Sequence, residues 1–60
     1  MVTMSAGRDY TTSSRYEFCV FDGEELVARE GLFMNKAAAK RAGLRAAKAY
    51  VALQEAVKHG

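Results

Sequence analysis

Residues 35–59, NKAAAKRAGLRAAKAYVALQEAVKH, combine six lysine and arginine side chains with a single acidic residue, Glu55. Amines and guanidinium groups bind phosphate oxygens, so this composition favours an anionic partner. Lys36 and Lys40 are one turn apart at the expected start of a helix, where the positive end of the dipole adds to their charge. An ordinary solvated helix face is the alternative interpretation. The candidate nucleic-acid-binding residues are Lys36, Lys40, Arg41, Arg45 and Lys48.

The charges of the chain are unevenly distributed along its length. Residues 36–60 carry six Lys/Arg and one Glu, a formal charge of +5, whereas residues 1–35 carry three Arg and six Asp/Glu, a formal charge of −3. The formal total at pH 7 is only +2. The C-terminal segment is therefore the part of the chain that we expect to face an acidic partner.

The sequence contains no arrangement of residues that is typical of an active site. Glu24 and Glu25 are adjacent carboxylates, but adjacent residues at a hairpin end point to opposite faces and are solvated turn charges in most proteins. His59 falls in the expected last turn of a helix, where a partial positive charge complements the dipole. Nucleotide-binding, hydrolase, zinc-protease and calcium-loop spacings are missing from the sequence. We therefore expect a non-enzymatic protein with no catalytic residues, cofactor, metal or small-molecule substrate.

Cys19 is the sole cysteine, so no disulfide can form within the chain, and with one histidine an ordinary zinc site cannot be assembled. We expect its side chain to be buried as a small hydrophobic group, and a position near a dimer axis is the alternative. A lone thiol fits a reducing compartment. The sequence has neither an apolar run of membrane-spanning length nor a signal-peptide hydrophobic region, so we expect a soluble, cytoplasmic protein without a membrane partner.

The local patterns predict one small α+β domain. Residues 1–14 are expected to form a flexible N-terminal arm, in which residues 10–12 could add a short edge strand. Residues 15–60 form the domain: a strand over 16–21, a turn at Asp22-Gly23, a returning strand over 26–29, and a helix capped by Asn35. The expected architecture is a ββα or βββα unit, with an antiparallel hairpin packed on one long C-terminal helix.

Both faces of the predicted hairpin are apolar. Alternation along the strands places one set on the first face, namely Tyr16, Phe18, Val20 and Val27. The second face would hold Cys19, Phe21, Leu26 and Ala28. Because one helix can cover only one face, we expect the other to be buried by the arm, by a second copy of the chain or by another protein.

The helix also has two apolar stripes at about 100° per residue. The broad stripe, suited to the hairpin, holds Ala39, Ala42, Gly43, Ala46, Ala49, Tyr50, Leu53 and Val57. A narrower stripe on the far side resembles a helix–helix seam and holds Leu44, Ala47 and Val51. Gly43 is either a site of close packing or a weak point in the helix. The two-faced hairpin and the second stripe together predict a homodimer whose interface contains Leu44, Ala47, Val51, Phe18, Val20 and Val27.

The segment that begins at Gly31 and continues as Asn35-Lys36-Ala37-Ala38-Ala39-Lys40-Arg41-Ala42-Gly43 resembles the C-terminal part of a double-stranded-RNA-binding domain. In that family a hairpin leads through a glycine into a helix beginning S-K-K-x-A-K-x-x-A-A. The resemblance covers residues 16–53 and implies phosphate contacts by Lys36 and Lys40. Ala37 stands where the motif has its middle lysine, and the N-terminal arm is too short for the family's first helix.

A second set of residues, Phe18, Asp22-Gly23-Glu24 and Lys36-Ala37-Ala38-Ala39, is similar to the strand, turn, strand and helix start of the YegP-like small domains. This resemblance implies that strand–strand–helix units associate into a larger shared sheet.

From these observations we expect a small, non-enzymatic, homodimeric binding module that contacts nucleic-acid phosphates through its basic helix. The alternative is a short regulator or inhibitor of the kind that phages and mobile elements encode. Such a protein would bind another protein through the second apolar face or the acidic end of the hairpin.

Overall fold

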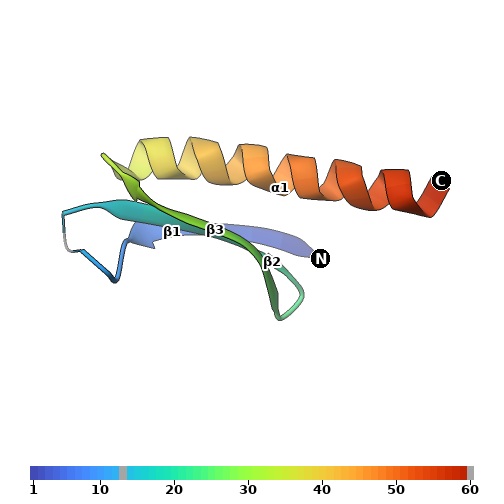
Figure 1. The fold of residues 1–60 in the computed structure, drawn as a ribbon, viewed down its shortest axis with the longest axis horizontal. Coiled ribbons are helices and arrows are strands. Elements are labelled where there is room, and N and C mark those ends of the chain that lie inside the picture. The colour runs from blue at the N-terminus through green and yellow to red at the C-terminus, as the bar shows by residue number, and fades with distance from the viewer. Residues whose placement is uncertain (13, 60) are drawn as a thin grey trace.

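The fold is a three-stranded antiparallel sheet with one long helix packed across one face (Figure 1). The computed structural model describes residues 1–12 and 14–59. The elements are β1 (Val2–Arg8), β2 (Tyr16–Asp22), β3 (Glu25–Phe33) and α1 (Lys36–His59), and β2 is the central strand. The expected α+β domain is therefore confirmed, in its βββα form.

The N-terminal segment is an ordered edge strand and not the flexible arm that we expected. β1 pairs with β2 from Val2 opposite Asp22 to Arg8 opposite Tyr16, without a register shift. Its apolar residues Val2, Met4 and Ala6 alternate with small polar ones, which is the pattern of a strand with one covered face. The short strand expected at residues 10–12 is absent, because these residues lie in the turn region after β1.

The predicted hairpin forms around Gly23. Asp22 lies opposite Glu25, so the loop consists of Gly23 and Glu24. Gly23 has a φ of 64°, a conformation that glycine adopts without steric cost. The carboxylate-rich loop turns away from α1, as Figure 1 shows. The turn was predictable because Asp-Gly between two apolar runs favours a tight hairpin.

Two bulges interrupt β3 and change which side chains share a face. Leu26 lies opposite Phe21 and Ala28 opposite Val20, so Val27 is the extra residue between them. Paired residues share a face, and Ala28 therefore lies on the Val20 side. The prediction that Ala28 lies on the opposite face was wrong, because a bulge reverses the alternation beyond it. Val27 is the unpaired residue of the bulge, so the register does not assign it to either face.

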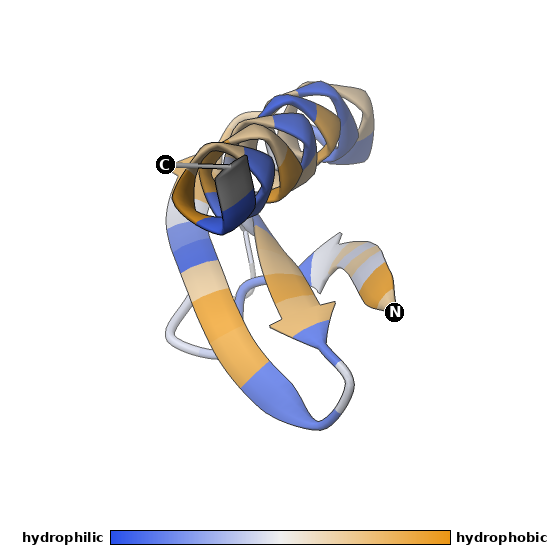
Figure 2. Ribbon diagram, turned by 90° about the vertical axis from the view of Figure 1, so that its right-hand side faces the viewer, coloured by the Kyte–Doolittle hydropathy of each residue, from blue (hydrophilic) through white to orange (hydrophobic). Residues whose placement is uncertain are grey.

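The core is the layer between β2 and the first half of α1. Phe18 is 3% exposed, and Val20 and Ala39 are fully buried. The ring of Phe33 lies 5.8 Å from that of Phe18, centroid to centroid. Gly43 lets the helix approach closely, because a Cβ placed there would lie 2.8 Å from Met4 Cγ and 2.9 Å from Phe18 Cβ. In Figure 2 the hydrophobic segments of the strands lie beneath the helix.

The helix begins at the predicted cap and extends beyond the end of the sheet. The Ala38 amide donates to Asn35 Oδ1 at 2.8 Å, which confirms the cap. The 24 residues of α1 span about 36 Å, whereas a seven-residue strand spans about 23 Å. Leu53 and Val57 are 64% and 72% exposed. These two residues belong to the expected core stripe but have no sheet beneath them, because the helix extends past the strands (Figure 1).

Candidate nucleic-acid interface

The five cations expected to contact phosphates are all exposed on α1, but they do not form one cluster. The buried residues Ala39 and Gly43 define the side of the helix that faces the sheet. At about 100° per residue, Arg41, Arg45 and Lys48 point within about 40° of directly outward. We call these three residues the outer cationic face. Lys40 projects sideways and Lys36 lies nearer the sheet, so this pair lies on the flank of the first turns.

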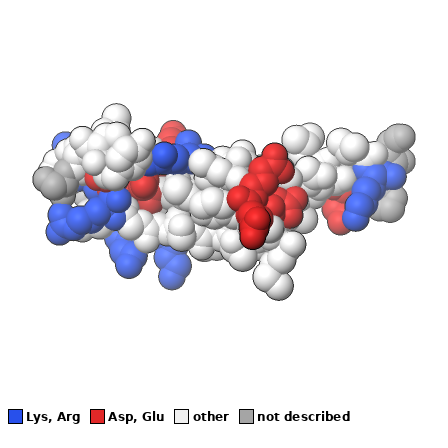
Figure 3. Space-filling view, turned by 90° about the horizontal axis from the view of Figure 1, so that it is seen from below, with Lys and Arg blue, Asp and Glu red and all other residues white. Residues whose placement is uncertain are grey.

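The carboxylates of the chain are concentrated away from this face. Figure 3, seen from the sheet side, shows acidic side chains gathered at the β2–β3 hairpin. Glu24 and Glu25 are exposed there. The acidic residue of α1, Glu55, is seven positions beyond Lys48, about 10 Å along the axis. The helix therefore presents positive charge outward while negative charge lies on the opposite side of the fold, which gives the molecule a directional field.

A hydrogen bond ties the middle of α1 to the acidic hairpin. The Tyr50 hydroxyl donates to Asp22 Oδ2 at 2.8 Å, and the amino group of Met1 lies 3.7 Å from Asp22 Oδ1. The hydrogen bond to the Asp22 carboxylate, together with burial, raises the pKa of Tyr50 above its ordinary value. The hydrogen bond of Tyr50 ties the helix to the end of β2 just after the last residue of the outer cationic face.

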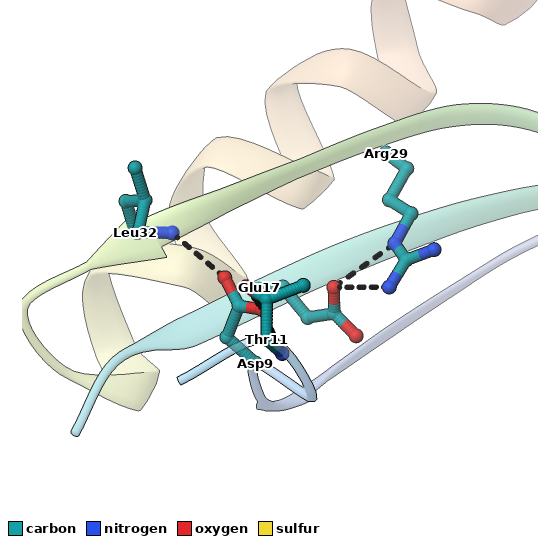
Figure 4. A network of polar contacts seen from close by, with 5 residues as sticks. All are labelled: Asp9, Thr11, Glu17, Arg29 and Leu32. Carbon is teal, nitrogen blue, oxygen red and sulfur yellow. Dashed lines mark hydrogen bonds and ion pairs between the residues drawn. The ribbon is translucent and has the colours of Figure 1, made fainter. Parts of the chain in front are cut away.

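A second polar cluster, the Asp9 network, joins the ends of β1 and β3 (Figure 4). Asp9 is 6% exposed and accepts hydrogen bonds from Thr11 Oγ1 at 2.6 Å, Thr11 N at 2.9 Å and Leu32 N at 3.2 Å. The Thr11 hydroxyl and then the Thr11 amide lower the pKa of this carboxyl. Gly31 has no room for a Cβ beside Asp9 Oδ2. Leu32 adopts a φ of 66°, which is strained for a leucine.

Next to Asp9, an ion pair and an aromatic ring border a hollow of about 280 Å³. Arg29 donates to Glu17 Oε2 through Nε and Nη2, both at 2.9 Å. The Tyr10 ring lies 4.2 Å from Arg29 Cζ, within the range of a cation–π contact. The hydrogen bond to Glu17 raises the pKa of Arg29. Because both carboxylates of this network are satisfied by donors, the cluster is suited to holding the strands together and not to proton transfer.

The predicted dimer-interface residues fall into separate places. Leu44 and Val51 are 47% and 42% exposed, and Ala47 lies beside them on the flank of α1 that faces β1. Phe18 and Val20 are covered by the chain's own helix, so they offer no surface to a second copy. Both hairpin faces are apolar, so the sequence alone does not show which of them the helix covers. Val27 is half-buried in the first bulge of β3, at the opposite sheet edge from β1.

Cys19 is half-buried and lies opposite Ser5 and Arg29 in the register, on the sheet face away from the helix. Its predicted burial in the interior was therefore too strong. Among residues 1–12 and 14–59, no three His, Cys, Asp or Glu side chains converge as metal ligands would. The side chain of His59, expected to complement the helix dipole, lies outside the described part of the structure.

The Asp9 network could not be predicted from the sequence, because its contacts depend on the register of three strands.

Comparison of the chain with protein-family models, curated proteins and solved structures found no match. Within the described part of the chain, no helix is both long enough and apolar enough to cross a lipid bilayer.

Proposed function

We propose that the protein is a non-enzymatic, homodimeric binding module that contacts nucleic-acid phosphates through the outer cationic face of α1. The observation that supports this most directly is the outward direction of Arg41, Arg45 and Lys48 on a helix whose opposite side is anchored to the sheet. The carboxylate-rich hairpin lies on the far side of the fold. An approaching polyanion therefore meets the positive side first.

Recognition in this proposal rests on charge and shape. The exposed helix positions near the three cations are occupied mainly by alanine, which offers no hydrogen-bonding group to a base edge. Phosphate contacts position a protein but carry no sequence information. We therefore expect weak sequence preference. Lys36 and Lys40 add two contacts where the phosphate backbone bends toward the first turn of the helix.

Salt dependence gives a quantitative test. On duplex DNA, three phosphate contacts per copy of the chain contribute about −2.7 to the slope of log K against log salt, and five contacts per copy contribute about −4.5. Fluorescence anisotropy with a labelled duplex at several salt concentrations measures the slope. Arg41→Ala, Arg45→Ala and Lys48→Ala should each reduce it by about one unit per copy of the chain. Alanine also favours helix, so these variants should stay folded.

Lys58→Ala is the matched control, because it removes the same charge from the same helix about 15 Å beyond Lys48. This control should keep the wild-type slope. Replacing Lys36 and Lys40 together by alanine should reduce the slope by about two units per copy without unfolding, since both side chains are exposed. An unchanged slope in the Arg41, Arg45 and Lys48 variants, or no binding of any DNA or RNA at low salt, would contradict the proposal.

A protein-binding regulator is the second candidate, and a specific observation favours it. Tyr10 and Leu32 are 75% and 70% exposed and border the same hollow, and Leu32 is held there in a strained backbone conformation. Exposed apolar side chains on strained backbone are common where proteins bind other molecules. If the duplex titrations fail, binding to protein partners through this end of the molecule becomes the leading explanation. Leu32→Gly, which suits the φ of 66°, would remove the side chain while keeping the fold.

A further inference from the structure

The two edge strands of the sheet differ in how well they are protected from pairing with another strand: β3 is protected, and β1 is not. β3 carries two bulges, the positive φ of Leu32 and several charged side chains, which are the features that keep natural sheet edges from pairing. β1 has none of these protections over residues 2–7, VTMSAG, and pairs with β2 in an unbroken register. It contains no proline and no charge before Arg8. Only β1 is therefore open to another strand.

The hydrogen bonds at both ends of β1 show which backbone groups face this open edge. Met1 O accepts from Gly23 N at 2.9 Å, and Asp9 N donates to Arg15 O at 2.9 Å. In an antiparallel pair the hydrogen-bonded positions alternate, so the odd-numbered residues of β1 bond to β2. Val2, Met4 and Ala6 consequently direct their N–H and C=O groups away from β2, toward the open edge.

An apolar surface continues from this edge onto the helix. Val2, Ala47, Val51 and Ala52, together with the stem of Lys48, line a hollow of about 370 Å³. Leu44, 47% exposed, lies on the same flank of α1 by the i, i+3, i+7 spacing. The open backbone edge and the apolar helix flank are thus neighbours on one side of the molecule.

We infer that a second copy of this chain covers both surfaces, by pairing its own β1 antiparallel to this one around a two-fold axis. The unpaired N–H and C=O groups of an edge strand are a template for another strand, and β1 is the edge that the chain itself offers. A two-fold operation brings each surface against its own copy, so the helix flank that lies on the β1 side meets the flank of the partner. One symmetric contact then satisfies the backbone and covers Leu44, Ala47 and Val51.

The register of the pair can be chosen from the side chains. With Met4 at the axis, Val2 faces Ala6 of the partner subunit on the helix side, and Thr3 faces Ser5 of the partner subunit on the other side. All three even-numbered residues then exchange backbone hydrogen bonds, and apolar groups meet apolar groups. The two copies form one continuous six-stranded sheet with both helices on the same face.

This inference specifies the homodimer of the proposed function and gives it a consequence for binding. The two α1 helices run antiparallel and side by side, and Arg41, Arg45 and Lys48 of each copy point away from the shared sheet. The basic surface is therefore doubled, and the salt slope per dimer should be about twice that of a monomer. The pairing itself does not require phosphate binding, so the two can fail separately.

Amide hydrogen exchange followed by NMR on the wild-type protein tests the surface directly. At concentrations where light scattering gives the dimer mass, the amides of Met4 and Ala6 should be protected, as those of Ser5 and Gly7 are through β2. On dilution to monomer, Met4 and Ala6 should lose protection while Ser5 and Gly7 keep it. A monomer at all concentrations, or a dimer in which Met4 and Ala6 exchange freely, would overturn the inference.

Two variants separate the strand from the helix contribution. Ala6→Pro removes an N–H that β2 does not use, so it should block the edge while keeping the monomer fold. Val51→Lys places a charge in the helix seam, and Leu53→Lys is its control because Leu53 lies on the other flank and is 64% exposed. We expect Ala6→Pro and Val51→Lys to weaken the dimer by about tenfold or more, and Leu53→Lys to leave it unchanged. Wild-type dimerisation in both of the first two variants would refute the pairing, and if Ala6→Pro fails to fold, Val51→Lys and the exchange data decide.

Discussion

Replacing Gly43 by alanine tests the close contact between α1 and the sheet, because two effects of opposite sign compete at this residue. Alanine stabilises a helix interior by about 0.8–1.0 kcal/mol relative to glycine. The added Cβ, however, would lie 2.8 Å from Met4 Cγ and Sδ and 2.9 Å from Phe18 Cβ. Met4 can change rotamer, but Phe18 Cβ is fixed to the central strand, so the helix must move. Overpacking of this kind costs about 1–3 kcal/mol.

Because Phe18 Cβ cannot move aside, we expect the steric cost to exceed the gain in helix propensity, with a net loss of up to about 2 kcal/mol in the free energy of unfolding. Urea and thermal denaturation followed by circular dichroism measure it, and Tm should fall by about 4–8 °C per kcal/mol. All variants should be compared at one protein concentration, because association adds to stability. Ala49→Gly, at an exposed position of the same helix, calibrates the propensity effect and should cost about 1 kcal/mol. A Gly43→Ala protein more stable than wild type would refute the close contact.

Two further predictions concern hydrogen bonds. Asn35→Ala removes the cap of the Ala38 amide and should lower the free energy of unfolding by about 1 kcal/mol, whereas Asn35→Asp should retain it; equal Tm values for wild type and Asn35→Ala would argue against the cap. The lowered pKa of Asp9 means that its contribution to stability is full above the ordinary pKa near 3.8 and is lost as pH falls through the lowered value. Asp9→Asn should therefore be less stable than wild type at neutral pH, and the difference in Tm should shrink below about pH 4; Tm curves that stay parallel from pH 7 to pH 2 would contradict this.

The features that were predictable from the sequence are those with local causes. The hairpin turn follows from Asp22-Gly23, the helix start from Asn35, and the anchored side of the helix from the spacing of Ala39 and Gly43. Each depends on residues within about one turn of one another, and the physical rule for each is short-range. The direction of the outer cationic face was also predictable, because it follows from helical periodicity once the buried side is known.

The features that were missed depend on contacts between distant segments. Residues 2–7 alternate weakly, since serine, threonine, alanine and glycine fit both strands and loops, and only pairing with β2 decides for a strand. The bulge at Val27 reverses which side chains of β3 face the helix, and no glycine or proline next to Val27 indicates a bulge in the sequence. The bond from Leu32 N to Asp9 joins residues 23 positions apart and exists because β1 and β3 end at the same place.

The length mismatch between α1 and the sheet divides the helix into two parts with different physical support. Up to Tyr50, whose hydroxyl is bound to Asp22, the helix is held by the sheet. Beyond it, Leu53 and Val57 are exposed, and helical structure rests on propagation from the anchored part and on the high propensity of alanine. Lys48, the last residue of the outer cationic face, lies on the anchored side of this boundary. The groups proposed to contact phosphate are therefore held in fixed positions whether or not the last two turns fray, and fraying would leave the affinity for nucleic acid unchanged.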